Sequence, residues 1–272
     1  MKAIIDLKRL KEIQVDMLKA FDTFCKDNSL TYFLTYGTLI GALRHKGYIP
    51  WDDDIDLIMP RNDYNRLISH FNTSCTDTSL RIIEHSIDSQ YYLPFAKLVN
   101  SKTVLKENVD NDYEIGIYID IFPLDNLSDD YSQAKKIMKK SFRFNRLLQF
   151  KTISLNRKRS PIKNVILIMG KTILHFQSIS HILSRFDSFC QSKRSDRFTK
   201  YVGVMTGTSA GDESRVFRKE WFENVEYAWF ENQEYPVPIG ADALLKQLYG
   251  DYMTPPPKDQ QVTHHSFEAW YK

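Results

Sequence analysis

The sequence predicts an α/β (α+β) protein in which helices flank a mixed β-sheet core and a helical segment is inserted in the second half. In the first half, short runs rich in β-branched and aromatic residues alternate with segments of helical periodicity. After residue 130 this alternation stops and long helical segments follow. We therefore expect a single domain over residues 1–272, with the sheet core at about 28–127, the insertion at about 128–200 and a C-terminal part at about 215–272.

The expected elements follow from local patterns. Residues 6–26 predict a helix, because apolar side chains recur at helical spacing from Leu7 through Met17 to Phe24. A helix at 62–71 and strands at 81–85, 92–99 and 116–122 are expected to complete the core. In the aromatic-rich C-terminal part, residues 225–237 are typical of a hairpin, and a helix at 241–249 ends at Gly250. The prolines at 255–257 then favour an extended tail that can cross the face of a sheet.

Composition limits the classes of function. A chain of 272 residues that is 42% hydrophobic and 26% charged can bury a full core. Its net charge of +3 is too small to indicate a nucleic-acid partner, and we expect none. The cysteines at positions 25, 75 and 190 have the spacing of neither a disulfide framework nor a zinc site, which suits a reducing cytoplasm. The sequence shows neither a signal peptide nor a membrane-spanning run of roughly 20 apolar residues. We therefore expect the protein in the cytoplasm, either free or at the inner face of the membrane.

The most informative segment covers residues 31–58. Residues 31–36 predict a strand, and residues 38–46 predict a short helix closed by Gly47. The turn between them, at Gly37 and Thr38, presents unpaired backbone N–H groups and a hydroxyl, which favour an anion such as a phosphate. Arg44 in the predicted helix is the natural fixed charge for a diphosphate.

A pair of carboxylates follows this turn. Asp54 and Asp56 lie two residues apart in a predicted strand, so both side chains point to one face. Neighbouring carboxylates repel each other, and a Mg²⁺ ion that also binds substrate phosphates removes that repulsion. We therefore expect Asp54 and Asp56 to bind Mg²⁺, with Mn²⁺ as the alternative. Asp52 and Asp53 are as consistent with a solvated turn as with this site.

Two more residues are expected near the carboxylate pair. Asp120 lies in an otherwise apolar strand, where an acid is costly unless it is paired or binds a metal, so it is the candidate third ligand. Asp125, which follows Pro123, is more typical of a loop or a cap. Lys97 lies on a strand expected to neighbour the site, where it is either solvated or contacts a phosphate. These patterns by themselves indicate Mg²⁺-dependent phosphoryl-group transfer.

The strand, Gly-Thr turn, helix and Asp-x-Asp strand resemble the nucleotidyltransferase superfamily. Together with the segments at 119–125 and 249–256 and the histidines His264 and His265, they resemble the LicD family. These are bacterial phosphocholine or related phospho-group transferases, similar to the catalytic domains of fukutin-type proteins. The resemblance implies a nucleotidyltransferase-like fold in which His264 is the histidine expected to reach the site.

The same resemblance implies a reaction. A phospho-alcohol group such as phosphocholine would pass from a CDP-linked donor, CDP-choline or similar, to a sugar hydroxyl of a cell-surface glycan or its precursor. Lipopolysaccharide, teichoic acid and capsule polysaccharide are the expected kinds of acceptor, and lipid-linked forms are included among them.

Two alternatives remain open. The same turn and carboxylates would serve a nucleotidyltransferase that moves a nucleoside monophosphate onto a small molecule, a protein or an RNA. The other alternative is a catalytically silent glycan-binding or assembly protein. The presence of both Asp54 and Asp56 argues against it, because a binding module has no use for two acids that repel each other.

The insertion carries many basic residues between Lys135 and Lys163, beside an apolar run at 165–169. One interpretation is a packed helical insertion whose bases are solvated. The other is a peripheral membrane contact, in which a basic amphipathic surface leans on an anionic membrane or on a phosphate-rich acceptor. On the membrane hypothesis, the cluster of Arg157, Lys158 and Arg159 contributes to binding.

Overall fold

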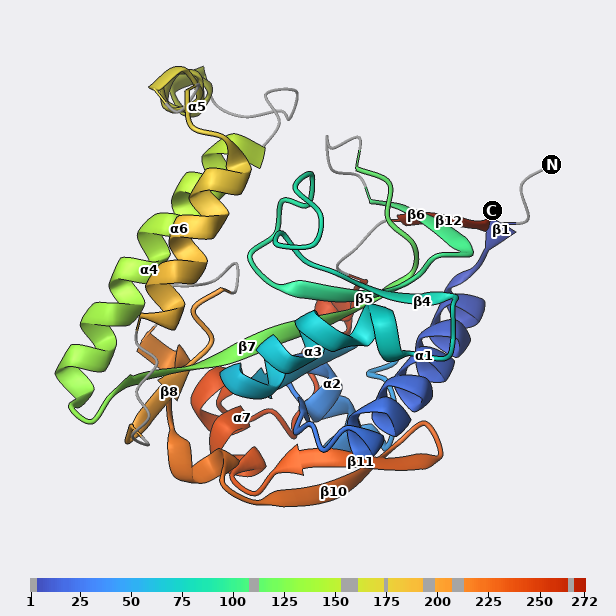
Figure 1. Cartoon of the computed structure of the whole chain (residues 1–272). Helices are drawn as coiled ribbons and strands as arrows, with labels where there is room; N and C mark the ends of the chain where they lie inside the picture. Colours follow the sequence, from blue (N-terminus) through green and yellow to red (C-terminus); the bar gives the residue numbers. More distant parts are fainter. Residues whose placement is uncertain are drawn as a thin grey trace.

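The structure is a computed structural model of the chain, and it describes residues 4–107, 113–152, 161–173, 176–192, 199–206, 213–263 and 267–272. The predicted α/β class is confirmed, because a mixed sheet is surrounded by helices (Figure 1). The basic cluster at 157–159 and the histidines at 264 and 265 lie outside the described residues. Within the described ranges, no helix is both long and apolar enough to cross a membrane.

The central sheet has seven strands built around the long strand β7. β3 pairs with β7 in parallel on one side, and β5 pairs with it antiparallel on the other. The second half of β7 pairs with β8 instead, which in turn pairs with β9. The strands of this sheet are β2 (Phe33–Leu34), β3 (Asp56–Pro60), β4 (Leu80–Ile83), β5 (Ala96–Asn100), β7 (Tyr118–Ser128), β8 (Tyr201–Gly203) and β9 (Val216–Arg218).

Two smaller sheets lie at the edges of the core. One is three-stranded and joins the two ends of the chain in the order β1 (Ile4–Ile5), β12 (Phe267–Tyr271) and β6 (Thr103–Glu107). The other is the hairpin of β10 (Val225–Phe230) and β11 (Gln233–Pro238), which falls where the sequence predicts a hairpin. β6 was not expected from the sequence.

The helices of the core are α1 (Leu7–Asp27), α2 (Tyr36–Ile40), the π-helical turn η1 (Gly41–His45), α3 (Arg61–Ser74) and α7 (Ala241–Tyr249). Short 3₁₀ turns cover η2 (Glu213–Arg215), η3 (Lys219–Phe222) and η4 (Lys258–Gln260). α1 begins as predicted, with Asp6 as its N-cap accepting from the backbone N–H of Arg9. α7 has the predicted bounds, and Gly250 after it takes a positive φ of 68°.

The main core lies between the sheet and these helices. Ile119 and Ile121 of β7 are fully buried, and Leu10, Leu18 and Phe21 of α1 belong to the same cluster. Because strand side chains alternate between faces, the burial of Ile119 and Ile121 directs the side chains on either side of them, including that of Asp120, to the opposite face. The core thus fixes which face of the sheet carries the polar residues.

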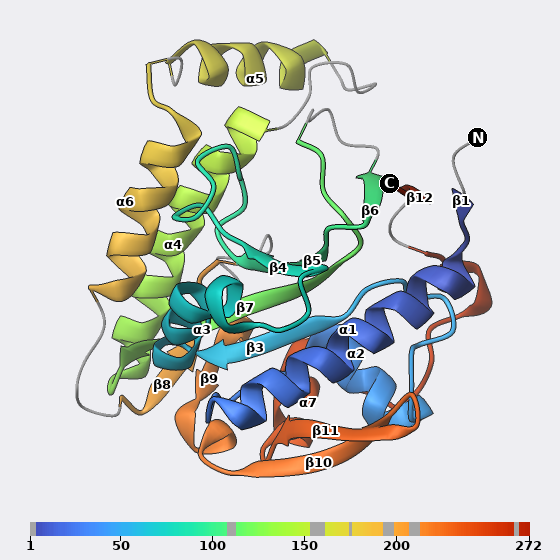
Figure 2. The same cartoon turned by 45° about the vertical axis from the view of Figure 1, so that its right-hand side comes forward.

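The helical insertion has a core of its own. It consists of α4 (Tyr131–Thr152), α5 (Pro161–Ile173) and α6 (Ile179–Gln191). α4 and α6 run side by side, and α5 lies across their far end in both views (Figures 1 and 2). Phe144 of α4 stacks on Phe186 of α6 with ring centroids 5.0 Å apart. α5 and α6 are separate helices, because Ser178 caps a new one by accepting from the backbone N–H of His181.

The structure also corrects the expected elements around the turn. The strand predicted at 31–36 is confined to Phe33–Leu34, because the chain already enters α2 at Tyr36. The helix predicted at 38–46 begins two residues earlier and continues as the π-helical turn η1. It ends at Lys46, which takes the left-handed conformation with φ 59°, and not at Gly47.

Candidate active site

A cavity of about 740 Å³ opens on the face of the sheet opposite the buried isoleucines, and its size suits a small-molecule ligand. Its walls come from segments far apart in the sequence: α2 and η1, the loop before β3, the strands β3, β5 and β7, and the tail after α7. The lining includes the predicted residues Gly37, Arg44, Asp54, Asp56, Lys97 and Asp120.

Three polar side chains form a row across the central strands. Asp56 of β3 and Lys97 of β5 are both register partners of Asp120 in β7, one on each side. Lys97 Nζ donates to Asp120 Oδ1 at 2.5 Å and lies 3.2 Å from the centre of the Tyr118 ring. The Lys97 side chain is buried, whereas Asp120 is partly exposed and faces the cavity. The cation therefore contacts the third predicted carboxylate directly, and this contact was not expected from the sequence.

The row has an excess of negative charge. Asp54 lies just ahead of β3 and lines the same cavity as Asp56 and Asp120. Burial, followed by the charges of Asp54, Asp120 and Asp52, raises the pKa of the Asp56 carboxyl well above its usual range, while Lys97 acts in the opposite direction. A cation added among these carboxylates would reverse the largest electrostatic cause of that shift. The residues present therefore fit a hard divalent ion such as Mg²⁺, which binds carboxylate oxygens.

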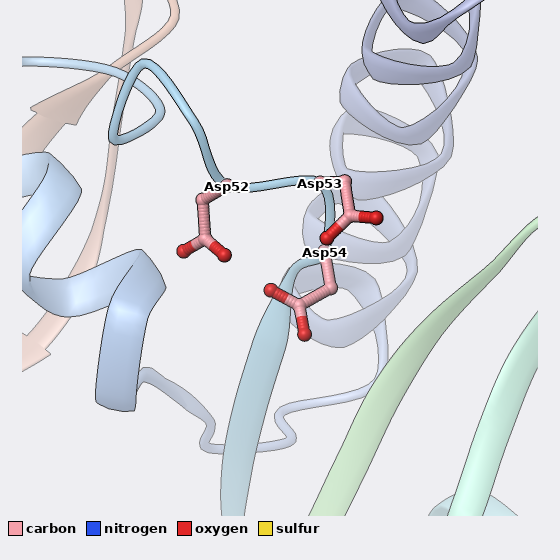
Figure 3. A group of neighbouring side chains, drawn as sticks. All are labelled: Asp52, Asp53 and Asp54. Atoms are coloured by element: carbon pink, nitrogen blue, oxygen red, sulfur yellow. The ribbon is translucent and has the colours of Figure 1, made fainter. Parts of the chain in front are cut away.

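The neighbouring acids lie closer together than the predicted ligands. Within the described parts of the chain, the group of carboxylates whose oxygens lie within 4.8 Å of one another is Asp52, Asp53 and Asp54. Figure 3 shows these side chains following one another along the loop that leads into β3. Asp52 lines the cavity, whereas Asp53 is buried and is absent from its lining. Asp53 is therefore not a solvated residue, whereas Asp52 is half-buried and joins the candidate site.

The Gly-Thr turn is built differently from the sequence expectation. Thr38 is buried, and its hydroxyl accepts a hydrogen bond from the backbone N–H of Asp56 at 2.8 Å. It therefore fixes the start of β3 rather than lining the cavity. Gly37 does line the cavity, and a Cβ there would lie 2.5 Å from Asp52 Oδ2. Because Gly37 has no side chain, the Asp52 carboxylate can lie close to its backbone.

Two arginines bring positive charge to the cavity. Arg44 lines it and donates from Nη1 to the carbonyl of Tyr252 at 2.5 Å, which ties η1 to the C-terminal tail. Arg215 also lines it, donating to the Tyr36 hydroxyl at 2.9 Å and lying 5.0 Å from the centre of that ring. Burial raises the pKa of Tyr36 to about 12, with Arg215 acting in the opposite direction. Sequence reasoning missed Arg215, since no motif surrounds it.

The C-terminal tail also reaches the cavity, as its extended path suggests. Tyr249 and Tyr252 line it together with Asp251, Thr254 and Pro256. His264, the histidine expected to reach the site, lies outside the described residues, as does His265.

Asp125 corrects another expectation, because it is neither a loop residue nor a cap. It is buried within β7, and its two oxygens accept from Nε and Nη2 of Arg61 at 2.6 and 2.9 Å. Arg61 also donates to Asp187 of α6 at 3.1 Å. This network joins the sheet to the insertion and lies outside the cavity lining.

The carboxylates in this ligand-sized cavity suit an enzyme that transfers a phosphoryl or nucleotidyl group. Residues 29–163 match the family model described as LicD/FKTN/FKRP, nucleotidyltransferase domain. The chain is also 30% identical over 275 residues to lipopolysaccharide cholinephosphotransferase LicD of Haemophilus influenzae, and the alignment covers 98% of both proteins. The chain therefore belongs to the LicD family and is an enzyme of the LicD type.

A second relative shares a shorter region. Mannosyltransferase regulator 4 of Saccharomyces cerevisiae is 33% identical over 120 residues, which are 41% of this chain and 10% of the yeast protein. This local similarity carries no argument about the function of the whole chain.

Proposed function

We propose that this protein transfers phosphocholine, or a similar phospho-alcohol, from a CDP-linked donor to a sugar hydroxyl of lipopolysaccharide or a related cell-surface glycan. The relative from Haemophilus influenzae, which aligns over nearly the whole chain, is named for cholinephosphate transfer to lipopolysaccharide. The structural observation that carries the proposal is the row of Asp56, Asp120 and Lys97, which faces a ligand-sized cavity together with Asp54.

In this proposal Asp54, Asp56 and Asp120 would hold Mg²⁺, with Asp52 close enough to Asp54 to take part. When bound, the ion would neutralise phosphate charge and favour in-line displacement at phosphorus. Lys97 holds Oδ1 of Asp120 and so fixes the orientation of that carboxylate in the cavity. Asp120 is in turn the simplest acceptor for the proton of the attacking sugar hydroxyl.

The remaining charges and rings of the cavity suit the donor. Arg44 and Arg215 supply fixed positive charge for a diphosphate, a group that guanidinium binds well. Trp51, Tyr249 and Tyr252 offer aromatic faces, on which a cytosine ring can stack or a trimethylammonium group can rest. Each half of a CDP-alcohol thus has a chemically suitable partner in the same cavity.

The proposal is tested by supplying several donors to the purified protein. CDP-choline, CDP-glycerol, CDP-ribitol and ATP, each labelled, are incubated with Mg²⁺ and isolated lipopolysaccharide, and the glycan is then assayed for label. Transfer of the phospho-alcohol from a CDP-linked donor supports the proposal. Transfer of a nucleoside monophosphate would identify a nucleotidyltransferase instead, and binding of lipopolysaccharide without any transfer would identify a glycan-binding protein. The Asp54→Asn variant is the inactive control.

A further inference from the structure

Charge is distributed very unevenly along the chain. Residues 131–186 contain 13 of the 37 lysines and arginines and none of the 34 aspartates and glutamates. The rest of the chain consequently has an excess of acidic residues. The basic segment covers α4, α5 and the first half of α6, so the positive charge is concentrated on the helical insertion.

α5 exposes apolar side chains to solvent, which is not expected of a helix that only packs on its neighbours. Ile168 is 50% exposed. The apolar residues Ile162, Val165, Ile166, Met169 and Ile173 are each between 54% and 75% exposed. Their spacing places them on one stripe of the helix, roughly 100° wide. Leu167, by contrast, is buried, and Gly170 lies against the ring of Phe150 in α4. α5 is therefore held to α4 by its other side, and the apolar stripe faces outward.

Basic residues also lie on the two helices next to α5. Lys140 and Arg143 of α4 and Arg185 of α6 line a hollow of about 190 Å³, which Gln177, just beyond α5, also borders. The lining contains no acidic residue, and its apolar members are Phe144, Leu147 and Ile182. In both views α5 and the adjoining ends of α4 and α6 project away from α7 and the β10–β11 hairpin (Figures 1 and 2). A flat surface can therefore approach this end of the molecule.

We propose that this end of the insertion, defined by the α5 stripe and the Lys140–Arg143–Arg185 hollow, binds the surface of an anionic lipid bilayer. α5 would lie in the interfacial region with its apolar stripe among the acyl chains, while the neighbouring bases contact lipid phosphates. This inference rests on the insertion alone and is independent of the group that the active site transfers.

The apolar stripe decides between a bilayer and a soluble polyanion. An RNA or a phosphate-rich glycan would need only the bases, and exposed Ile, Val and Met side chains would add nothing to its binding. A bilayer uses both, because burial of apolar side chains adds to the electrostatic attraction. The apolar contribution is insensitive to salt, whereas the basic contribution is screened by it.

The test is co-sedimentation of the full-length protein with vesicles of phosphatidylcholine, alone or mixed with phosphatidylglycerol. The double variant Ile166→Asp, Met169→Asp removes the stripe at exposed positions. Its matched control is Ile239→Asp, Val262→Asp, which adds the same charge at two exposed apolar positions elsewhere. Lys140→Ala, Arg143→Ala removes bases from the hollow, and Lys8→Ala, Lys258→Ala removes the same charge from other exposed positions.

The wild type should bind the mixed vesicles at low salt and bind phosphatidylcholine vesicles much less. Each insertion variant should bind the mixed vesicles at least about tenfold more weakly than its control, with unchanged thermal melting and unchanged turnover on a soluble acceptor. Equal binding of the wild type to both vesicle types would overturn the proposal. So would an Ile166→Asp, Met169→Asp variant that binds mixed vesicles like its control, because the bases would then be recognising a polyanion without an apolar contact.

Discussion

Lys97 and Asp120 form an ion pair across neighbouring strands, with Nζ 2.5 Å from Oδ1, in the same row as Asp56. The pair explains how a central strand can carry an acid among apolar residues, because the buried ammonium group offsets part of the carboxylate charge. It also gives Lys97 a role besides the two that the sequence suggested, which were solvation and a direct phosphate contact.

The first prediction concerns Lys97. We expect Lys97→Met to lower turnover at least about tenfold, equivalent to about 1.4 kcal/mol, because Asp120 would lose the group that orients it. Mg²⁺ affinity measured by calorimetry should be unchanged or tighter, since the cavity would then hold more net negative charge. Lys106→Met, at an exposed lysine of β6, is the control and should change neither quantity. Normal turnover in Lys97→Met would show that the ion pair has no part in the reaction.

The second prediction concerns the stability of the metal-free protein. The pKa of Asp56 is raised in the folded state above its ordinary value of 3.8. At pH values just above 3.8 the folded protein therefore keeps a proton on this carboxyl that the unfolded chain has released. The associated stabilisation is fully present below that ordinary value and is lost as the pH rises. We therefore expect Asp56→Asn to melt at a higher temperature than the wild type near neutral pH, with a difference that shrinks as the pH falls towards about 4.

The same variant should lose its enzymatic activity. Asp56→Asn is expected to retain less than about one per cent of turnover, and added Mg²⁺ should raise the melting temperature of the wild type more than that of the variant. A variant that melts below the wild type at neutral pH without metal would mean that repulsion among these carboxylates is not the dominant effect at Asp56.

The third prediction tests how Gly37 acts. A Cβ at this position would lie 2.5 Å from Asp52 Oδ2, so Gly37→Ala should displace the Asp52 side chain and weaken donor binding. A double-mutant cycle with Asp52→Ala separates this cause from a direct clash with the donor. If Asp52 is the group displaced, Gly37→Ala will weaken donor binding measured by calorimetry in the wild type and change it little in Asp52→Ala. An equal loss in both backgrounds would place the phosphate itself against Gly37.

The fourth prediction concerns the Arg61–Asp125 pair. Both side chains are buried, so Asp125→Asn leaves a buried guanidinium without its bidentate partner. We expect the free energy of unfolding in denaturant to fall by about 3–5 kcal/mol. Lys246→Met breaks an exposed pair with Asp242 and should leave the free energy of unfolding nearly unchanged. Similar losses in the two variants would contradict a structural role for the buried network.

The sequence predicted those parts of the fold that local patterns determine. The α7 helix has both its apolar stripe and its terminal glycine within ten residues, and its bounds are those predicted. The left-handed residue after η1 could not be placed in this way. Gly47 was the natural choice by conformational preference, yet Lys46 takes that conformation.

Residues brought together by tertiary structure were the ones missed. Arg61 and Asp125 are 64 positions apart, and Arg215 and Tyr36 are 179 apart, so no local pattern links either pair. Asp120 was chosen because an acid in an apolar strand needs a partner, and in the structure it lines the cavity. The identity of that partner, Lys97, depends on the register of β5 against β7, which the sequence alone does not reveal.

The central claim is that the cavity around Asp54, Asp56 and Asp120 transfers a phospho-alcohol from a CDP-linked donor. It is tested most directly with CDP-choline carrying different labels in its cytidine and choline parts, incubated with the protein, Mg²⁺ and isolated lipopolysaccharide. The account predicts that the choline label enters the glycan with its phosphate and that the cytidine label is released as CMP. Cytidine label in the glycan, or equal choline transfer by the Asp54→Asn variant, would contradict it.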